Sequence, residues 1–390
     1  MKRTALITIH SVPNYGSVLQ TYATLRVMAD AGMECDVIDY RYPNEWHYSH
    51  GQPREPFLQR LKSTLAAPLL EAVGIHSQHI LKRRLDRFRR THFRFTRPFA
   101  NLSELEQADW SRYQAVIAGS DQIWNPKFLL GDKAFMLSFV PDDVRKVSLA
   151  SSFACSEIPG RMVDAYRECL SRFDAITVRE DNGLDIISRQ LGLEIKPRRV
   201  LDPTLLLDAP KWDAMCSAGI DSLPQEPYIV LYGLNYAFET RPYIYEALNE
   251  MKNRMGVKRV VALSEWPDPS APSGLVVDNY RDVHVECFVA LMRNARGVVT
   301  SSFHGTAFAL NFGRPLISIV PQGSNDDRQS SLLRLAGAPE IITPVGTPLS
   351  QIVHEYDTGQ VASELDRIRK EDISTILKNI DPQWNLSSDK

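Results

Sequence analysis

The sequence predicts an α/β protein with two doubly wound domains that face each other across a cleft. Short apolar runs alternate with amphipathic segments along most of the chain, the pattern of parallel sheets covered by helices. A stretch poor in apolar residues, 208–227, separates two such series, and 390 residues suit two or three domains. We therefore expect an N-terminal domain over residues 1–210, a C-terminal domain over residues 222–360, and a closing helix and tail over residues 361–390.

The N-terminal half opens with a strand, a loop, a helix and a second strand. These elements are predicted at residues 4–9, 10–16, 17–30 and 36–40. Such a unit is the building block of doubly wound sheets, and its loop directs backbone N–H groups toward the end of the helix. Further strands are predicted at residues 113–118, 146–150, 175–178 and 199–201.

Residues from about 50 to 100 break this alternation and are predicted to form a helical, basic insertion. Eight basic side chains lie between Lys82 and Arg97, against the single acid Asp86. Leu81, Leu85 and Phe88 recur there at near-helical spacing. A basic amphipathic helix either makes a peripheral contact with anionic lipid or is an ordinary solvated helix face, and both interpretations are retained.

The C-terminal half repeats the alternation, with strands predicted at residues 228–232, 257–263, 297–300 and 315–320 and helices at 241–254, 284–294 and 364–378. Strand 297–300 runs into Ser301-Ser302-Phe303-His304-Gly305-Thr306, and a helix is expected to start at about residue 307. Ligands of doubly wound folds bind at such strand ends. This junction combines free helix N–H groups, hydroxyls and an imidazole, which suits acid–base chemistry on an anion. The alternative is a hydroxyl cluster that caps the helix, with a structural histidine beside it.

Charge and cysteine content exclude several other classes of protein. A formal net charge of −2 gives no indication of nucleic-acid binding. The five cysteines are scattered without CxxC spacing, so neither a zinc site nor a disulfide framework is expected. No metal and no cofactor is predicted. The N-terminal apolar run is too short for a signal peptide, and no run reaches the roughly 18 apolar residues of a membrane span, so we expect a cytoplasmic protein.

Five sequence blocks together resemble the polysaccharide pyruvyl transferase family. They are residues 14–23 (NYGSVLQTYA), 119–125 (GSDQIWN), 178–180 (VRE), 202–207 (DPTLLL) and 300–306 (TSSFHGT), and the resemblance extends from about residue 4 to about residue 335. It implies two Rossmann-like domains in the glycosyltransferase-B arrangement. It also implies phosphoenolpyruvate as donor co-substrate and a sugar of a surface-polysaccharide precursor, which in some cases is lipid-linked, as acceptor. The product is a pyruvate ketal, with release of phosphate.

This chemistry requires a general acid for the methylene carbon of phosphoenolpyruvate and a base for the sugar hydroxyl. His304 is the predicted acid, because an imidazole can give a proton at neutral pH and a nearby phosphate favours its charged form. The resemblance implies the same role. Asp121, after the strand at 113–118, is the predicted partner of the sugar hydroxyl. An Asx-turn or a helix cap is the alternative for Asp121.

The donor needs cations for its phosphate and carboxylate. Arg179 lies at the end of strand 175–178, where a guanidinium can bind either group at two points. The resemblance implies that role, and a structural pair with Glu180 or Asp181 is the alternative. Arg328 is a second candidate, although this chain has Asp326-Asp327-Arg328 where the family often shows Asn-Ser-Arg. The predicted phosphate site is completed by Ser301, Ser302, Gly305 and Thr306.

The predicted acceptor-binding residues are Asn14, Tyr15, Gly16, Gln20, Gln122 and Trp124. For the first four the alternative is turn chemistry before a helix, and for Trp124 it is a place in the core.

Two other functions also fit the sequence. One is a sugar-nucleotide-dependent glycosyltransferase of the same architecture, and the other is a non-catalytic glycan-binding protein. The presence of His304, Arg179 and the hydroxyl-rich loop disfavours the non-catalytic interpretation.

Overall fold

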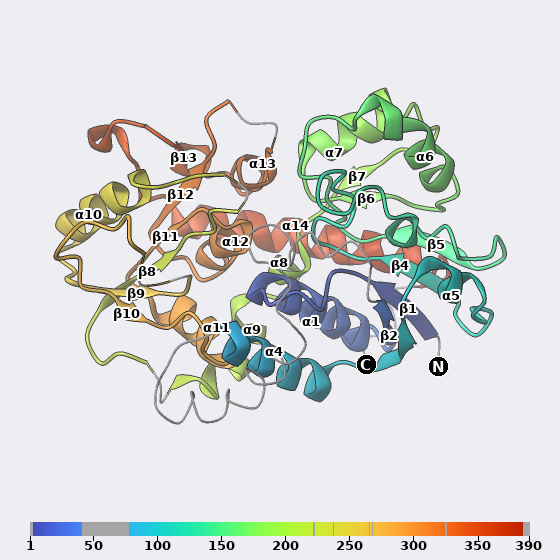
Figure 1. Cartoon of the computed structure of the whole chain (residues 1–390), viewed down its shortest axis with the longest axis horizontal. Coiled ribbons are helices and arrows are strands. Elements are labelled where there is room, and N and C mark those ends of the chain that lie inside the picture. Colours follow the sequence, from blue (N-terminus) through green and yellow to red (C-terminus); the bar gives the residue numbers. More distant parts are fainter. Residues whose placement is uncertain are drawn as a thin grey trace.

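Two parallel sheets lie next to each other, each flanked by helices (Figure 1). The structure is a computed structural model and describes residues 3–40, 78–220, 223–236, 238–264, 266, 268–323 and 326–384. The strands of the first sheet fall between residues 3 and 148, and those of the second between residues 228 and 344. We refer to the parts of the chain on either side of residue 220 as the N-terminal half and the C-terminal half.

The sheet of the N-terminal half has the strand order β3-β2-β1-β4-β5, and all neighbouring strands are parallel. The order reverses between β1 and β4, and ligands bind at such switch points. Helix α1 (Tyr15–Asp30) follows β1 and is capped by Asn14, whose side chain accepts a hydrogen bond from the backbone of Gly16. The predicted strands at 4–9, 36–40, 113–118 and 146–150 are confirmed with shifted ends as β1 (Arg3–Ile7), β2 (Glu34–Tyr40), β4 (Ala115–Ala118) and β5 (Arg145–Ser148).

A smaller parallel pair, β6 (Thr177–Val178) and β7 (Arg198–Arg199), extends the first sheet through isolated bridges from Val147 to Ala175 and from Ser151 to Val178. The segment 208–227, predicted as a boundary, contains a packed helix, α9, whose buried Trp212 contacts the rings of Tyr22 and Phe308. Besides α1, the helices of this half are α4 (Gln78–His92), α5 (Leu102–Glu106), α6 (Gly160–Leu170), α7 (Asp181–Asp185), α8 (Pro203–Leu206) and α9 (Ala209–Ser217), with short turns of helix at Lys133–Met136 and Ile186–Gln190.

The sheet of the C-terminal half has the order β10-β9-β8-β11-β12-β13, again with every pair parallel. Its switch point lies between β8 and β11. The predicted strands at 228–232 and 297–300 are confirmed to the residue as β8 (Tyr228–Tyr232) and β11 (Gly297–Thr300). The remaining strands are β9 (Arg259–Ala262), β10 (Asp278–Asn279), β12 (Leu316–Val320) and β13 (Ile342–Pro344). The helices are α10 (Tyr243–Met255), α11 (Val285–Asn294), α12 (Phe303–Asn311) and α13 (Arg328–Leu335), with short turns at Pro339–Ile341 and Leu349–Gln351.

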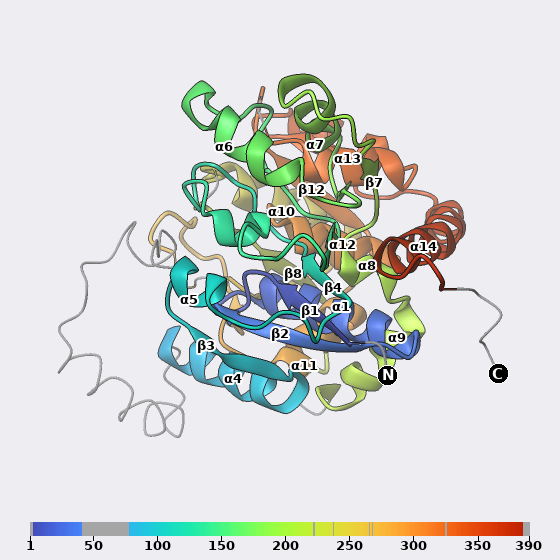
Figure 2. The same cartoon turned by 90° about the vertical axis from the view of Figure 1, so that its right-hand side faces the viewer.

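The basic segment is only in part the helical insertion that the sequence predicts. Helix α4 (Gln78–His92) ends before Arg94, and the chain then forms β3 (Phe95–Phe99), the edge strand of the first sheet. The apolar side of α4 is buried, with Phe88 against the ring of Tyr22 on α1, so protein already covers the face that lipid would need. Figure 2 shows α4 below the first sheet, beside α11. The part of this prediction before residue 78 lies outside the described residues.

Buried apolar contacts join the two halves. One cluster includes Leu19 of α1, Leu205 of α8, Phe288 of α11 and Phe308 of α12. Helix α14 (Thr358–Ile380) runs from α12 to β5 of the first sheet (Figure 1). Its Asp372 accepts a hydrogen bond from the backbone of Leu201, which follows β7. No helix in the described part of the chain is long and apolar enough to cross a membrane.

Candidate active site

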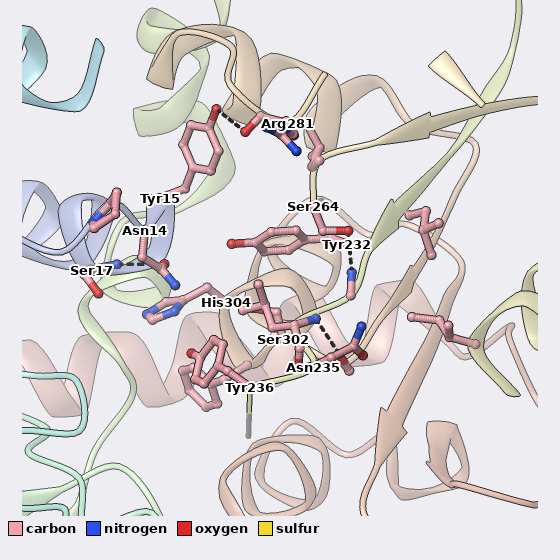
Figure 3. Close-up of a pocket in the computed structure, with 18 of the residues that line it drawn as sticks. Asn14, Tyr15, Ser17, Tyr232, Asn235, Tyr236, Ser264, Arg281, Ser302 and His304 are labelled. Carbon is pink, nitrogen blue, oxygen red and sulfur yellow. Dashed lines mark hydrogen bonds between the residues drawn. The ribbon is translucent and has the colours of Figure 1, made fainter. Parts of the chain in front are cut away.

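A cavity of about 800 Å³ lies where the two sheets present their switch points to each other. The N-terminal half contributes the β1–α1 loop with Asn14, together with Asp121 and Gln122 after β4. The C-terminal half contributes loops after β8, β9 and β11, including Ser302 and His304 (Figure 3). Because the carboxyl ends of parallel strands meet at one edge, segments distant in the sequence converge here.

His304 enters this site from the first turn of α12, which starts at Phe303 rather than at about residue 307. Its side chain is 9% exposed, and its Nε2 atom lies 3.8 Å from Oδ2 of Asp202. Nε2 has no hydrogen-bond partner among the described residues. The other side of the ring lies on Gly16, where a Cβ atom would come within 2.1 Å of Nδ1 of His304. The imidazole of the C-terminal half is therefore held by the N-terminal half.

Asp202 is a site residue that the sequence analysis missed. Its side chain is fully buried, and Oδ2 accepts hydrogen bonds from Nη1 of Arg179 (2.9 Å) and Oγ of Ser120 (2.7 Å). Oδ1 accepts from the backbone N–H and the hydroxyl of Thr204, so Asp202 also caps α8. The only sequence signal was its place in the DPTLLL block, which resembles an ordinary helix cap before proline.

Arg179 does not line the cavity but lies beneath it. Its guanidinium is fully buried, 4.3 Å from the centre of the Phe303 ring, and Nη2 is 3.6 Å from Oδ1 of Asp121. Nε is 3.8 Å from Glu180, so the alternative pairing with Glu180 is also present, although the hydrogen-bonded carboxylate is Asp202. Nε and Nη2 lack hydrogen-bond acceptors among the described residues. Such unpaired donors on a buried guanidinium are rare.

Asp121 is held in an unusual backbone conformation at the edge of the cavity. Its φ angle is 78°, in the left-handed region that aspartate tolerates better than most residues. Oδ2 accepts a hydrogen bond from Oγ of Ser17 (2.6 Å), and Oδ1 accepts one from the backbone of Gln122 (2.8 Å). The carboxylate is thus fixed from both sides and faces the cavity.

The ionisation of this cluster follows from burial and pairing. Burial opposes ionisation of Asp121 and Asp202, but the charge of Arg179, that of a protonated His304 and the hydrogen bonds that each carboxylate accepts together hold both pKa values below their usual range. Burial lowers the pKa of His304, although the two aspartates act to raise it. Burial also raises the pKa of Glu180 to about 7. The cluster therefore combines the Arg179 guanidinium and two ionised aspartates with an imidazole that burial shifts toward its neutral form.

Replacing Asp202 by asparagine is expected to reduce the free energy of unfolding by about 3–5 kcal/mol, because the buried guanidinium of Arg179 would lose its hydrogen-bonded carboxylate. Urea denaturation measures this change. The control is Asp164→Asn, which removes an exposed pair with Arg167 and should leave the unfolding midpoint close to that of the wild type. Equal unfolding curves for Asp202→Asn and the wild type would contradict the structural role of this carboxylate.

Comparisons with known proteins identify the family. The family model for polysaccharide pyruvyl transferase matches residues 14–323, which is most of the chain. The chain belongs to the polysaccharide pyruvyl transferase family. The resemblance drawn from the five sequence blocks is thereby confirmed, and the matched region contains His304, Arg179 and Asp202. No curated protein sequence matches the chain significantly.

Solved structures share the fold at low sequence identity. UDP-GlcNAc 2-epimerase from Methanocaldococcus jannaschii gives a TM-score of 0.50 at 10% identity, over 95% of this chain and 100% of that chain. S. aureus MnaA with UDP gives 0.51 at 12%, over 100% and 99% of the two chains. Arabidopsis thaliana UGT89C1 with UDP gives 0.51 at 12%, over 97% and 99%. The predicted fold class, two Rossmann-like domains in the glycosyltransferase-B arrangement, is thereby confirmed.

In this pyruvyl transferase family member the predicted donor residues separate into two groups. Ser301, Ser302 and Arg328 line the cavity, and Arg328 forms an ion pair with Asp326. Two further residues of the predicted phosphate site are placed otherwise. The backbone N–H of Gly305 faces Oγ of Ser302 (3.4 Å), and the Thr306 hydroxyl is buried against that of Ser318. The reason is the early start of α12, which turns these groups into helix caps and core contacts.

The predicted acceptor residues separate in the same way. Asn14, Tyr15 and Gln122 line the cavity, and the hydroxyl of Tyr15 donates to the backbone oxygen of Val283 (2.7 Å). Gly16 instead supports His304. Two residues lie away from the lining: the buried amide of Gln20 donates to Thr8, and Trp124 is 1% exposed among Phe153 and Phe173, with its indole N–H bonded to the backbone of Phe135. Trp124 is therefore a core residue and cannot stack on a sugar here.

The described residues contain no group of three or more histidine, cysteine, aspartate or glutamate side chains that could hold a metal ion. The charged groups whose fields reach His304 include the pair Arg179–Asp202 and Arg328, which is paired with Asp326.

Proposed function

We propose that this protein transfers the pyruvyl group of phosphoenolpyruvate to two hydroxyls of a sugar in a surface-polysaccharide precursor. The product is a pyruvate ketal, and inorganic phosphate is released. The family supports a transferase that acts on polysaccharide. The observation that carries the proposed pyruvyl transfer is the position of His304 in the cavity wall. His304 belongs to the C-terminal half and lies against Asp202 and Gly16 of the N-terminal half.

In the proposed reaction His304, once protonated, gives its proton to the methylene carbon of phosphoenolpyruvate and makes C2 electrophilic. A sugar hydroxyl adds to C2 and loses its proton to Asp121, which faces the cavity. The bond between C2 and the phosphate oxygen then breaks, and phosphate leaves with the bonding electrons. A second sugar hydroxyl adds to C2, its proton passes to phosphate or solvent, and the ketal closes.

Positive charge for the donor comes from three groups: Arg328, Arg179 and the protonated form of His304. Arg328 lines the cavity, and Arg179 lies beneath it with two unpaired N–H groups. Because each already has a carboxylate partner, a neutral His304 would leave the cluster short of positive charge for an anion. Protonation of His304 supplies that charge and also prepares the acid. As part of this proposal, the acceptor is a free or lipid-carried precursor, the reaction is cytoplasmic, and phosphoenolpyruvate is the only co-substrate.

Binding of phosphoenolpyruvate is expected to take up a proton on His304. Burial lowers its pKa in the free protein, and a bound phosphate or carboxylate would raise it. The added affinity is complete below the free-state pKa and is lost as pH rises through the bound-state pKa. The dissociation constant should therefore increase with pH, approaching roughly tenfold per pH unit in that interval. Isothermal titration calorimetry in buffers of different ionisation enthalpy measures the proton uptake.

His304→Gln is the control for this pH dependence. Phosphoenolpyruvate has a titrating phosphate of its own, and the variant retains that contribution while removing the imidazole. The difference between the two pH profiles isolates His304. Identical profiles, or equal proton uptake by both proteins, would contradict protonation of His304 on donor binding.

The proposed function is tested by the thermal midpoint and by product formation. Phosphoenolpyruvate is expected to raise the midpoint of the wild-type protein, whereas UDP is not, because only a ligand of the folded state stabilises it. A coupled assay then measures phosphate release with a panel of surface-glycan precursors. A shift with UDP and none with phosphoenolpyruvate would favour a sugar-nucleotide-dependent glycosyltransferase instead.

A further inference from the structure

Beyond His304 the cavity continues into the C-terminal half. Its walls there come from the loop after β8, which includes Leu234, Asn235 and Tyr236, and from the segment after β9, which includes Ser264 and Asp268. We call this part of the cavity the β8–β9 lobe. The backbone of the loop is fixed from below, because the N–H of Leu234 donates to Oγ of Ser301 (2.8 Å) and that of Gly233 to Oγ of Ser264 (3.2 Å).

The guanidinium of Arg241 in the β8–β9 lobe is already paired with two carboxylates. Nη2 of Arg241 lies 2.6 Å from Oε2 of Glu239, and Nη1 lies 3.4 Å from Oδ2 of Asp268. The hydroxyl of Tyr245 also donates to Asp268. A pyrophosphate bound here would have to displace these carboxylates from the guanidinium. A neutral polyol needs only hydrogen-bonding groups such as the Asn235 amide and the Ser264 hydroxyl, so the lobe suits an uncharged sugar better.

Tyr236 is the exposed aromatic side chain on the cavity wall among the described residues. It is 44% exposed, whereas Tyr15, Tyr232, Tyr245 and Phe303 on the same wall are buried. Its ring centre is 6.4 Å from that of Phe128 in the N-terminal half, so the pair spans the two halves. Tyr236 lies near Asp121 and Arg328, whose charges act on the pKa of its hydroxyl (Figure 3 shows Tyr236 in the wall with His304).

We propose that Tyr236 is the platform on which the acceptor sugar packs, with the rest of the sugar in the β8–β9 lobe. The C–H face of a pyranose is apolar and covers an aromatic face well, while its hydroxyls remain free at the ring edge. On this platform a sugar would present those hydroxyls toward Asp121 and His304. This inference rests on the proposed function and assigns the stacking role to Tyr236 in place of the buried Trp124.

The test is saturation-transfer NMR with the methyl glycosides of glucose, galactose, mannose, N-acetylglucosamine and N-acetylmannosamine as probes, each with saturating inorganic phosphate present. For at least one glycoside, the wild-type protein and Tyr236→Phe should give signals on the sugar ring protons. Tyr236→Ala should weaken the affinity by about fivefold or more, because a packed aromatic face is lost. Val353→Ala is the control for loss of an exposed apolar side chain outside the cavity, and it should bind as the wild type does.

The outcomes separate this inference from the proposed function. Equal signals for Tyr236→Ala and the wild type, or no signal from any glycoside with the wild type, would overturn the assignment of Tyr236. The midpoint shift with phosphoenolpyruvate is measured in parallel and should be the same in Tyr236→Ala. The wild-type protein could also bind a glycoside through Tyr236 and yet show neither a midpoint shift with phosphoenolpyruvate nor phosphate release. That result would support Tyr236 as the sugar platform and contradict the proposed transferase function.

Discussion

Replacing His304 by alanine is expected to lower turnover by at least two orders of magnitude while leaving the protein folded. Loss of a positioned general acid usually costs this much or more. The fold should tolerate the change, because Nε2 of His304 makes no hydrogen bond within the described part of the chain and the ring lies in the cavity wall. Phosphate release at saturating phosphoenolpyruvate measures turnover, and the thermal midpoint measures folding.

His354→Ala is the matched control, since this partly buried histidine lies outside the cavity and burial lowers its pKa as well. It should retain nearly full turnover. If His304→Ala keeps more than about a tenth of the wild-type rate, His304 is not the general acid. If His304→Ala retained full function, the non-catalytic glycan-binding alternative would be favoured.

Replacing Gly16 by alanine is expected to have an effect of similar size on turnover, although the new methyl group touches no substrate. A Cβ atom at this position would lie 2.1 Å from Nδ1 and 2.5 Å from Cγ of His304, so the imidazole must leave its present position beside Asp202. A displacement of about 1 Å in a catalytic group can cost roughly a hundredfold in rate. Gly16 is in the first turn of α1 without a positive φ angle, so alanine suits the helix itself. Turnover and thermal midpoint are measured as for His304.

Gly160→Ala provides the control at the start of another helix, α6, where a Cβ atom would meet nothing within 4 Å. This variant should keep the wild-type rate and midpoint. A Gly16→Ala protein with full turnover would show that His304 can act without its contact to the N-terminal half. A Gly16→Ala protein that no longer folds would show that this contact is structural, and the smaller His304→Ala side chain should then restore folding to the double variant.

Much of the fold was predictable from local sequence pattern. Continuous apolar runs identified β8 and β11 to the residue, because a strand covered on both faces leaves little room for polar side chains. The alternation of such runs with amphipathic segments implied parallel sheets and a ligand site at their carboxyl edge. The positions of His304 and Asp121 beside the cavity follow from the same reasoning, since each comes after a strand of its own sheet.

Other features depend on contacts between distant segments, which a local pattern does not encode. From the sequence Asp202 is indistinguishable from an ordinary helix cap. Its place beside His304 arises because α8 and α12 pack together, and its place beside Arg179 because the chain after β6 lies against the start of α8. The sequence around Gly16 indicates only a turn before a helix, and its contact with the His304 imidazole of the other half appears only in the tertiary structure. Likewise, nothing in the spacing of Trp124 and Tyr236 tells which ring is buried and which is exposed.

Composition and periodicity along the chain thus determined most of the strands and helices, such as β8 and β11, because these depend on neighbours within a few residues. The arrangement of the site was decided by tertiary structure. Burial, hydrogen-bond partners and the pKa of His304 depend on which halves meet and at what distance. All three depend on contacts between residues more than a hundred positions apart, such as His304 with Asp202 and with Gly16. Such contacts exist only once both sheets have formed and packed together.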